Sequence, residues 1–256
     1  MHKYNRGVTI VEILISILII AIVMVFLYRL FIQVRNEEEG NAIQSQFVIA
    51  QSQIEQAVEE DLVDYGVKSI KACNIYNVDI DDNSIYNEPG TNDLDNYKCL
   101  EITYNTPSNI VDNTGYIMIY KYYTRYDNKT LQGKDPKWIV RYTKGHFDVD
   151  VSGNRTKWNS QTQVTNELPD ELDLSEIPYV TYSRTPNTLK MNDTLKIVLP
   201  IKDSVGLHYD INLTIDINHD NEFTCTSTEN SSNLYYRLKC NCTGDSNLCS
   251  SSIDKK

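Results

Sequence analysis

The sequence predicts an α+β protein in which a long N-terminal α-helix packs on an antiparallel β-sheet domain. Two observations support this prediction. An uninterrupted helix-forming stretch occupies about the first quarter of the chain, and the remainder alternates β-branched and aromatic runs with polar, turn-forming stretches. The chain has 256 residues, so the part beyond its apolar N-terminus suits one globular domain and not a large multidomain enzyme.

The first predicted element is an apolar run from Val8 to Tyr28. As a helix it would be about 31 Å long, which matches the thickness of a bilayer core. No small-residue signal-peptidase site of the A-x-A kind follows it. Residues 1–7 contain basic side chains whereas residues 37–39 are glutamates, so the positive-inside rule places the N-terminus in the cytoplasm. Residues 8–28 are therefore predicted to span the membrane, with the C-terminal domain outside.

Two features distinguish this run from a plain membrane anchor. A carboxylate, Glu12, lies inside it, where desolvation is costly unless the group has a partner or a function. Gly7 stands between the basic leader MHKYNRG and the apolar run, five residues before that glutamate. Gly7 followed by Val8-Thr9-Ile10-Val11-Glu12 resembles the prepilin cleavage site of type IV pilins and type II secretion pseudopilins.

The resemblance implies that a prepilin peptidase removes residues 1–7 by cutting between Gly7 and Val8. It also implies methylation of the new N-terminal amine, on valine here in place of the family's common phenylalanine. Glu12 would then neutralise that amine on a neighbouring subunit within a filament. The alternative for Glu12 is a carboxylate near the cytoplasmic interface that reaches water at little cost.

The helix is expected to continue beyond the membrane, over residues 29–65. This stretch has no proline and one glycine, Gly40, and its residues are mostly good helix formers. Its apolar residues recur at steps of three and four and so define one face: Ile43, Phe47, Ala50, Ile54, Ala57, Val58, Leu62 and Tyr65. Gly66 is the expected C-terminal stop. The alternative, a coiled-coil stalk, needs a sustained heptad seam, so packing of the helix on its own sheet is favoured.

Residues 66–256 are predicted to form an extracellular β-rich domain with a cysteine-containing tail, loop-rich between Gly66 and residue 90. The predicted strands, each a β-branched or aromatic run, are 99–104, 116–125, 138–143, 146–151, 178–183, 194–201 and 209–217. In 209–217 apolar and polar residues alternate strictly, which indicates one buried face. The order of the first three strands resembles that of the larger, J-type minor pseudopilins.

Six cysteines lie beyond the apolar run, and an even number on one side of a membrane favours an oxidising compartment. They are Cys73, Cys99, Cys225, Cys240, Cys242 and Cys249. A bridge between Cys73 and Cys99, plus one or two bridges within the C-terminal four, is the preferred pairing. Reduced thiols and a metal clip at Cys240 and Cys242 remain alternatives, although the four histidines are scattered.

The charge balance of 24 basic against 35 acidic residues gives a net charge of -11, which argues against nucleic-acid binding. No phosphate-binding loop, nucleophile elbow or metalloprotease helix is present, so neither an enzyme nor a cofactor is expected. Basic residues lie among the aromatic strands and suggest an adhesive or DNA-contacting patch or, more simply, ion pairs with acidic side chains on a sheet face; they are Lys121, Arg125, Lys137 and Arg141. Calcium is a minor hypothesis for a carboxylate-rich turn made of Asp216, Asn218, Asp220 and Glu222.

The leading hypothesis is a minor pilin or pseudopilin, a structural subunit of a pilus, competence or type II secretion-like filament. Its expected partners are prepilin peptidase, the membrane and other pilin subunits, which it would contact through the N-terminal helix. Two alternatives stay open. One is a tip adhesin or ligand-binding pilin, and the other is a single-pass membrane-anchored ectodomain that does not polymerise.

Overall fold

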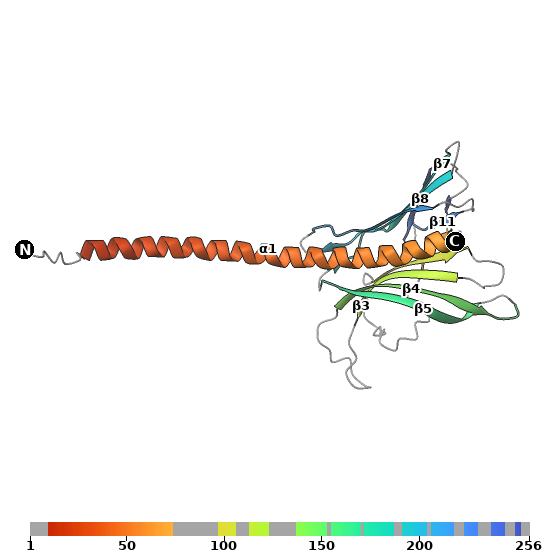
Figure 1. Ribbon diagram of the computed structural model, residues 1–256, viewed down its shortest axis with the longest axis horizontal. Helices are drawn as coiled ribbons and strands as arrows, with labels where there is room; N and C mark the ends of the chain where they lie inside the picture. The colour runs from red at the N-terminus through yellow and green to blue at the C-terminus, as the bar shows by residue number, and fades with distance from the viewer. Residues whose placement is uncertain are drawn as a thin grey trace, which may run out of the picture. The chain divides into compact units, whose positions relative to one another are not determined.

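The structure is a computed structural model, and it describes residues 10–73, 97–105, 113–122, 137–152, 155–169, 172–186, 191–203, 206–217, 223–229, 237–243 and 249–251. The chain divides into two compact units, Met1–Ser45 and Gln46–Lys256. One helix, α1 (Ile10–Tyr65), has 56 residues and belongs to both units (Figure 1). The strands belong to the second unit. The predicted α+β fold class, with a long apolar-starting helix and β-sheets, is confirmed.

Helix α1 ends where the sequence predicts. Gly66 adopts a positive φ of 69°, a left-handed conformation that glycine reaches without steric cost. Its backbone N–H donates to the carbonyl of Leu62 at 2.8 Å, which satisfies one of the carbonyl groups that a helix end leaves without a partner. The chain then enters a strand directly.

Two large sheets make up the second unit. The first has seven strands in the order β13-β11-β1-β2-β3-β4-β5, and the second has four in the order β10-β8-β7-β12. The bounds of the first sheet are β1 Val67–Ala72, β2 Tyr97–Tyr104, β3 Asn113–Tyr122, β4 Lys137–Val149, β5 Arg155–Leu168, β11 Thr224–Ser227 and β13 Cys249–Ser251. Those of the second are β7 Tyr179–Pro186, β8 Met191–Leu199, β10 Ile211–Ile217 and β12 Lys239–Thr243. A small ladder pairs β6 (Leu172–Asp173) with β9 (Lys202–Asp203).

Most neighbouring strands are antiparallel, and β1 to β5 form a meander. Three pairs are parallel: β1 with β11, β11 with β13, and β7 with β12. All three involve the C-terminal strands. The C-terminal part of the chain therefore supplies edge or near-edge strands to both sheets, and this arrangement is not predicted by the sequence.

Each predicted strand overlaps an observed one, with corrections. The runs 138–143 and 146–151 form one strand, β4, because Gly145 stays in the ladder with a local register shift. The region after Gly66 was expected to be a loop but begins with β1, whose short apolar pattern is weak. Strands β5, β11, β12 and β13 are not predicted, since their residues are mostly polar and contain no run of apolar side chains. Residues 123–125 lie outside the described part.

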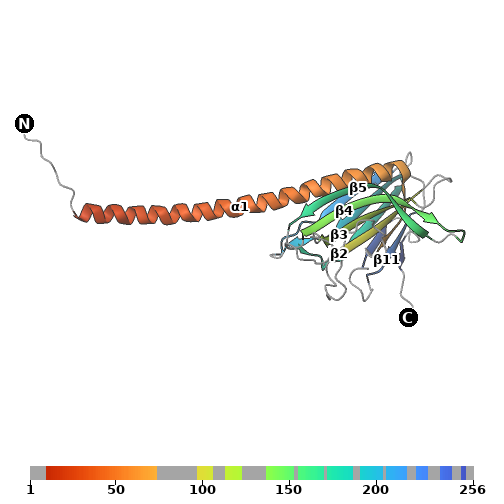
Figure 2. The same ribbon diagram turned by 90° about the horizontal axis from the view of Figure 1, so that it is seen from below.

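The core of the second unit includes the apolar stripe of the C-terminal part of α1. From Gln46 onward this helix runs alongside the sheets, with β7 and β8 on one side of it and β3 to β5 on the other in Figure 1, and it follows one edge of the unit beside β5 in Figure 2. Five residues of the predicted apolar stripe are 5% exposed or less: Phe47, Ala50, Ile54, Val58 and Leu62. One face of the helix is therefore buried against the sheets, whereas residues such as Val48, Ile49 and Val63 are exposed on the other face, as an apolar stripe predicts.

Candidate functional site: the N-terminal helix and its seat in the β domain

The N-terminal part of α1 presents apolar side chains to its surroundings. From Ile10 to Val34 its large apolar residues are between 40% and 78% exposed. In the described part of the chain, α1 is the helix long and apolar enough to cross a membrane, and none of its apolar stretch is buried within the protein. Such a surface is unfavourable in water and favourable in lipid or against other apolar helices.

Glu12 lies in the first turn of α1 with an exposed side chain. It is the one charged residue between Ile10 and Leu27. The hydroxyl of Ser16 donates to the backbone carbonyl of Glu12 at 2.8 Å, one turn along the helix. Gly7 and Val8, the predicted cleavage and methylation residues, lie outside the described residues.

The C-terminal part of α1 contacts both sheets through its side chains. The ring of Phe47 stacks on that of Tyr209, just before β10, with centroids 4.7 Å apart and planes 8° from parallel. The amide of Gln51 donates to the backbone carbonyl of Asn212 in β10 at 3.1 Å. Near the end of the helix, Tyr65 lies 6.4 Å from Tyr104 of β2. The residues near Phe47 thus contact the region of the four-stranded sheet, and the residues near Tyr65 contact the seven-stranded sheet.

A buried polar network fixes α1 to the seven-stranded sheet. Asp61 of the helix is 7% exposed, and one of its carboxylate oxygens accepts a hydrogen bond from the Tyr142 hydroxyl at 2.6 Å. Its other oxygen forms an ion pair with the ammonium of Lys144, which also lies 4.5 Å from the centroid of the Tyr65 ring. The hydroxyls of Tyr104 and Tyr142 are 2.6 Å apart. The attraction between the two charges and the hydrogen bond from Tyr142 therefore offset the desolvation cost of burying the ion pair.

Burial also determines the protonation of the two tyrosines. Desolvation raises the pKa of Tyr104 and of Tyr142 far above the ordinary value of 10.0, and the nearby Asp61 carboxylate adds to both shifts. Both phenols consequently stay neutral and keep their hydrogen atoms to donate. The sequence pattern does not predict this network, although Asp61 stands seven residues after Ile54, at a position that continues the apolar stripe. A carboxylate at such a position was the available signal.

The cysteines are oxidised in the described structure. Cys73 is bonded to Cys99, the pairing favoured by the sequence analysis, and Cys225 is bonded to Cys240. Cys242 is disulfide-bonded as well. Cys240 and Cys242, the proposed metal clip, are therefore both engaged in disulfides, and the alternative of reduced thiols is not supported.

The remaining candidates are only partly covered by the described residues. Asp216 accepts a hydrogen bond from Thr194 at 2.9 Å, whereas Asn218, Asp220 and Glu222 lie outside the described residues, so the calcium hypothesis stays a prediction. Of the basic side chains, Lys137 pairs with Glu167 at 2.6 Å and Lys121 lies 5.3 Å from the Trp138 ring. These contacts favour ion pairing on a sheet face over a free basic patch.

Comparison with known protein families gives a match at the N-terminus. Residues 2–28 match a family model described as "Prokaryotic N-terminal methylation motif". No curated protein and no solved structure matches the chain. The match covers the basic leader, Gly7, Glu12 and the apolar start of α1. This chain therefore carries an N-terminal segment similar to the methylation motif of type IV pilins and pseudopilins, joined to a β-rich unit for which no match was found.

Proposed function

We propose that this protein is a minor pilin or pseudopilin, a structural and non-enzymatic subunit of a type IV pilus, competence or type II secretion-like filament. The observation that supports it most is the methylation motif at residues 2–28, which runs directly into the single 56-residue helix α1. Prepilin peptidase removes residues 1–7, and the β-rich unit then lies outside the cell membrane. The size of the β-rich unit supports a low-copy role.

In this proposal, assembly depends on electrostatics inside the packed helices. Cleavage leaves a positively charged amine on Val8, methylated or not, at the start of an apolar helix. The Glu12 carboxylate of a neighbouring subunit neutralises this charge, because two opposite charges attract strongly where water is excluded. An unpaired charge in the same place costs several kcal/mol, so the pair also selects the axial register between subunits.

The first test is mass spectrometry of the mature protein from cells that possess the processing peptidase. The expected chain begins at Val8, with or without one added methyl group. A mature chain that still begins at Met1 would contradict the proposal and leave a membrane-anchored ectodomain that does not polymerise.

The second test separates assembly from processing. Glu12→Ala and Glu12→Gln should both be inserted and cleaved normally, but their incorporation into filaments should fall at least about tenfold, since both lose the charge that neutralises the amine. Incorporation is measured by immunoblot of sheared filaments against the membrane fraction. Glu37→Ala is the matched control, because Glu37 is an exposed carboxylate of the same helix beyond the apolar run. Normal incorporation of the Glu12 variants would refute the proposed role of this residue.

A further inference from the structure

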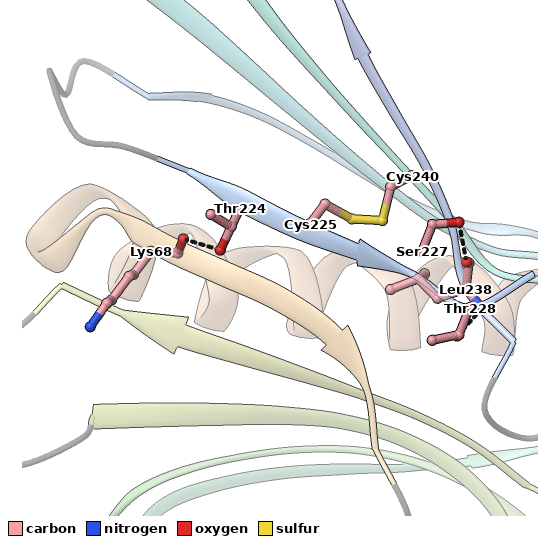
Figure 3. The surroundings of a disulfide bond; sticks show 7 residues. All are labelled: Lys68, Thr224, Cys225, Ser227, Thr228, Leu238 and Cys240. Atoms are coloured by element: carbon pink, nitrogen blue, oxygen red, sulfur yellow. Dashed lines mark hydrogen bonds between the residues drawn. A yellow bond between two sulfur atoms is a disulfide. The ribbon is translucent and has the colours of Figure 1, made fainter. Parts of the chain in front are cut away.

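The two large sheets are connected by a covalent bond. Cys225 lies in β11 of the seven-stranded sheet and Cys240 in β12 of the four-stranded sheet, and the two are joined by a disulfide (Figure 3). No strand is shared between the two sheets in the described part of the chain. Cys225 is fully buried. The bond therefore links the two sheets directly to one another.

The polar groups next to this bond reinforce the connection. The backbone N–H of Thr228 donates to the carbonyl of Leu238 at 2.8 Å, and the N–H of Leu238 donates to the Thr228 hydroxyl at 3.1 Å. The Ser227 hydroxyl donates to the same Leu238 carbonyl at 3.2 Å (Figure 3). On the other side of β11, Thr224 donates to the carbonyl of Lys68 in β1 at 3.4 Å. Strand β11 is thus bonded to β1 within its own sheet and, through the disulfide and these hydrogen bonds, to the segment that contains β12.

The two sheets bind α1 by different means. The seven-stranded sheet holds the helix with the buried Asp61–Lys144 ion pair and the Tyr142 hydrogen bond. The four-stranded sheet contacts it through apolar burial, the stacking of Phe47 on Tyr209 just before β10, and a part-buried hydrogen bond from Gln51. Apolar contact is non-directional, so this second interface has fewer features that fix its position.

We propose that the Cys225–Cys240 disulfide is a latch that keeps the four-stranded sheet closed over the apolar face of α1. Strand β12 runs parallel to β7, with Cys240 opposite Val180, and β7 continues through β8 to β10 by antiparallel ladders. The bond at β12 therefore restrains the whole four-stranded sheet. Without it, this sheet opens as a unit while α1 stays on the seven-stranded sheet. The latch does not depend on the filament role proposed above.

Hydrogen exchange followed by mass spectrometry tests the latch on the full chain in detergent micelles. In Cys225→Ala/Cys240→Ala, the amides of β8 and β10 are expected to exchange at least about tenfold faster than in the parent, because the sheet opens locally. The amides of β3 and β4 should keep their parent rates. Unchanged exchange in β8 and β10, or an equal rise in both sheets, would overturn the proposal.

The matched control is Cys73→Ala/Cys99→Ala. These cysteines are also buried, but they join the end of β1 to β2 within one sheet, where the Cys73 N–H already donates to the Cys99 carbonyl at 2.9 Å. Their sequence separation is 26 against 15 for the latch, so their removal relaxes the unfolded chain at least as much. A selective rise in β8 and β10 in this control would also overturn the proposal.

A second measurement covers the case in which the alanine pair does not fold. The folded parent protein is treated with a water-soluble phosphine, which reduces the disulfides, and exchange is followed over time. Faster exchange in β8 and β10 before any change in β3 and β4 is the expected result. Simultaneous loss of protection in both sheets would show that the bond stabilises the domain as a whole and is no latch.

Discussion

Asp61 shows how a single residue can fix the position of a long helix. Its carboxylate is nearly excluded from water, and the Tyr142 hydroxyl and the Lys144 ammonium satisfy it from the facing sheet. Apolar contacts are non-directional, so with these contacts alone the helix could slide or rotate on the sheet with little loss of stabilising free energy. The hydrogen bonds that the Asp61 carboxylate accepts are short-ranged and directional, so they define one axial and rotational position of the helix.

Removal of the Asp61 carboxylate should therefore be costly. Asp61→Ala leaves the Lys144 ammonium in a buried position without its partner, and we expect the free energy of unfolding to fall by about 3 kcal/mol. Asp64→Ala, an exposed carboxylate in the same turn, should change it by no more than about 0.5 kcal/mol. Denaturant titration of the full chain in micelles, followed by circular dichroism, measures both.

The double variant Asp61→Leu/Lys144→Met provides the control for this prediction. It removes both charges together, so most of the stability lost in Asp61→Ala should return. Equal losses in Asp61→Ala and Asp64→Ala would contradict the importance of the ion pair.

Strand β3 has to leave room for this network. Gly115 pairs with Ile102 of β2 and Lys144 of β4 in the ladder. A Cβ atom at Gly115 would lie 2.8 Å from the Tyr104 hydroxyl and 2.9 Å from the Tyr142 ring, closer than real Cβ contacts. The absence of a side chain there is what allows the two tyrosine hydroxyls to meet beneath α1. Gly40 in the middle of α1 is different, because a Cβ there meets nothing within 4 Å.

Alanine at these two glycines should have opposite effects. Gly115→Ala forces the buried tyrosines apart, so it should lower the free energy of unfolding by about 2 kcal/mol, a typical cost of overpacking. Gly40→Ala should stabilise α1 by up to about 1 kcal/mol, because alanine restricts the unfolded chain and favours the helix. Thermal unfolding of the two variants under the same conditions measures the difference. A neutral Gly115→Ala would show that the network tolerates displacement.

At the scale of the whole molecule, disulfides tie together the C-terminal strands, which are short and polar and have little apolar surface of their own. Strand β11 places Cys225 directly opposite Cys249 of β13, while Cys225 itself is bonded to Cys240 of β12. Cys242, also disulfide-bonded, is separated from Cys240 by one residue. The described C-terminal strands are thereby linked to both sheets.

We expect all six cysteines to be oxidised, with Cys242 bonded to Cys249, since the other four are taken by two bridges. Alkylation of the denatured, unreduced protein should label no cysteine, and alkylation after reduction should label all of them. A non-reducing peptide map should contain a cross-linked Cys242–Cys249 peptide. A free thiol at Cys249 would refute this pairing.

The sequence by itself determined the features that depend on local pattern. Helix α1, its end at Gly66, its apolar stripe and the strongly alternating strands such as β10 follow from periods of 3.6 and 2, which short-range backbone geometry imposes. The fold class predicted from them is confirmed. The methylation motif was likewise visible, because leader, glycine, apolar run and glutamate are contiguous, whereas cleavage at Gly7 and the role of Glu12 stay predictions.

Tertiary structure alone decided which strands share a sheet, why Asp61 is buried and how the layers are linked. Pairings such as β1 with β11 join residues distant in the sequence, and their energy comes from burial and from ladder hydrogen bonds that local patterns do not encode. The local sequence around Asp61 does not reveal its partners, because Tyr142 and Lys144 come from a strand, 81 and 83 residues later in the chain. The same holds for Cys225 and Cys240, because a disulfide depends on the approach of two Cβ atoms, which only the folded chain brings together.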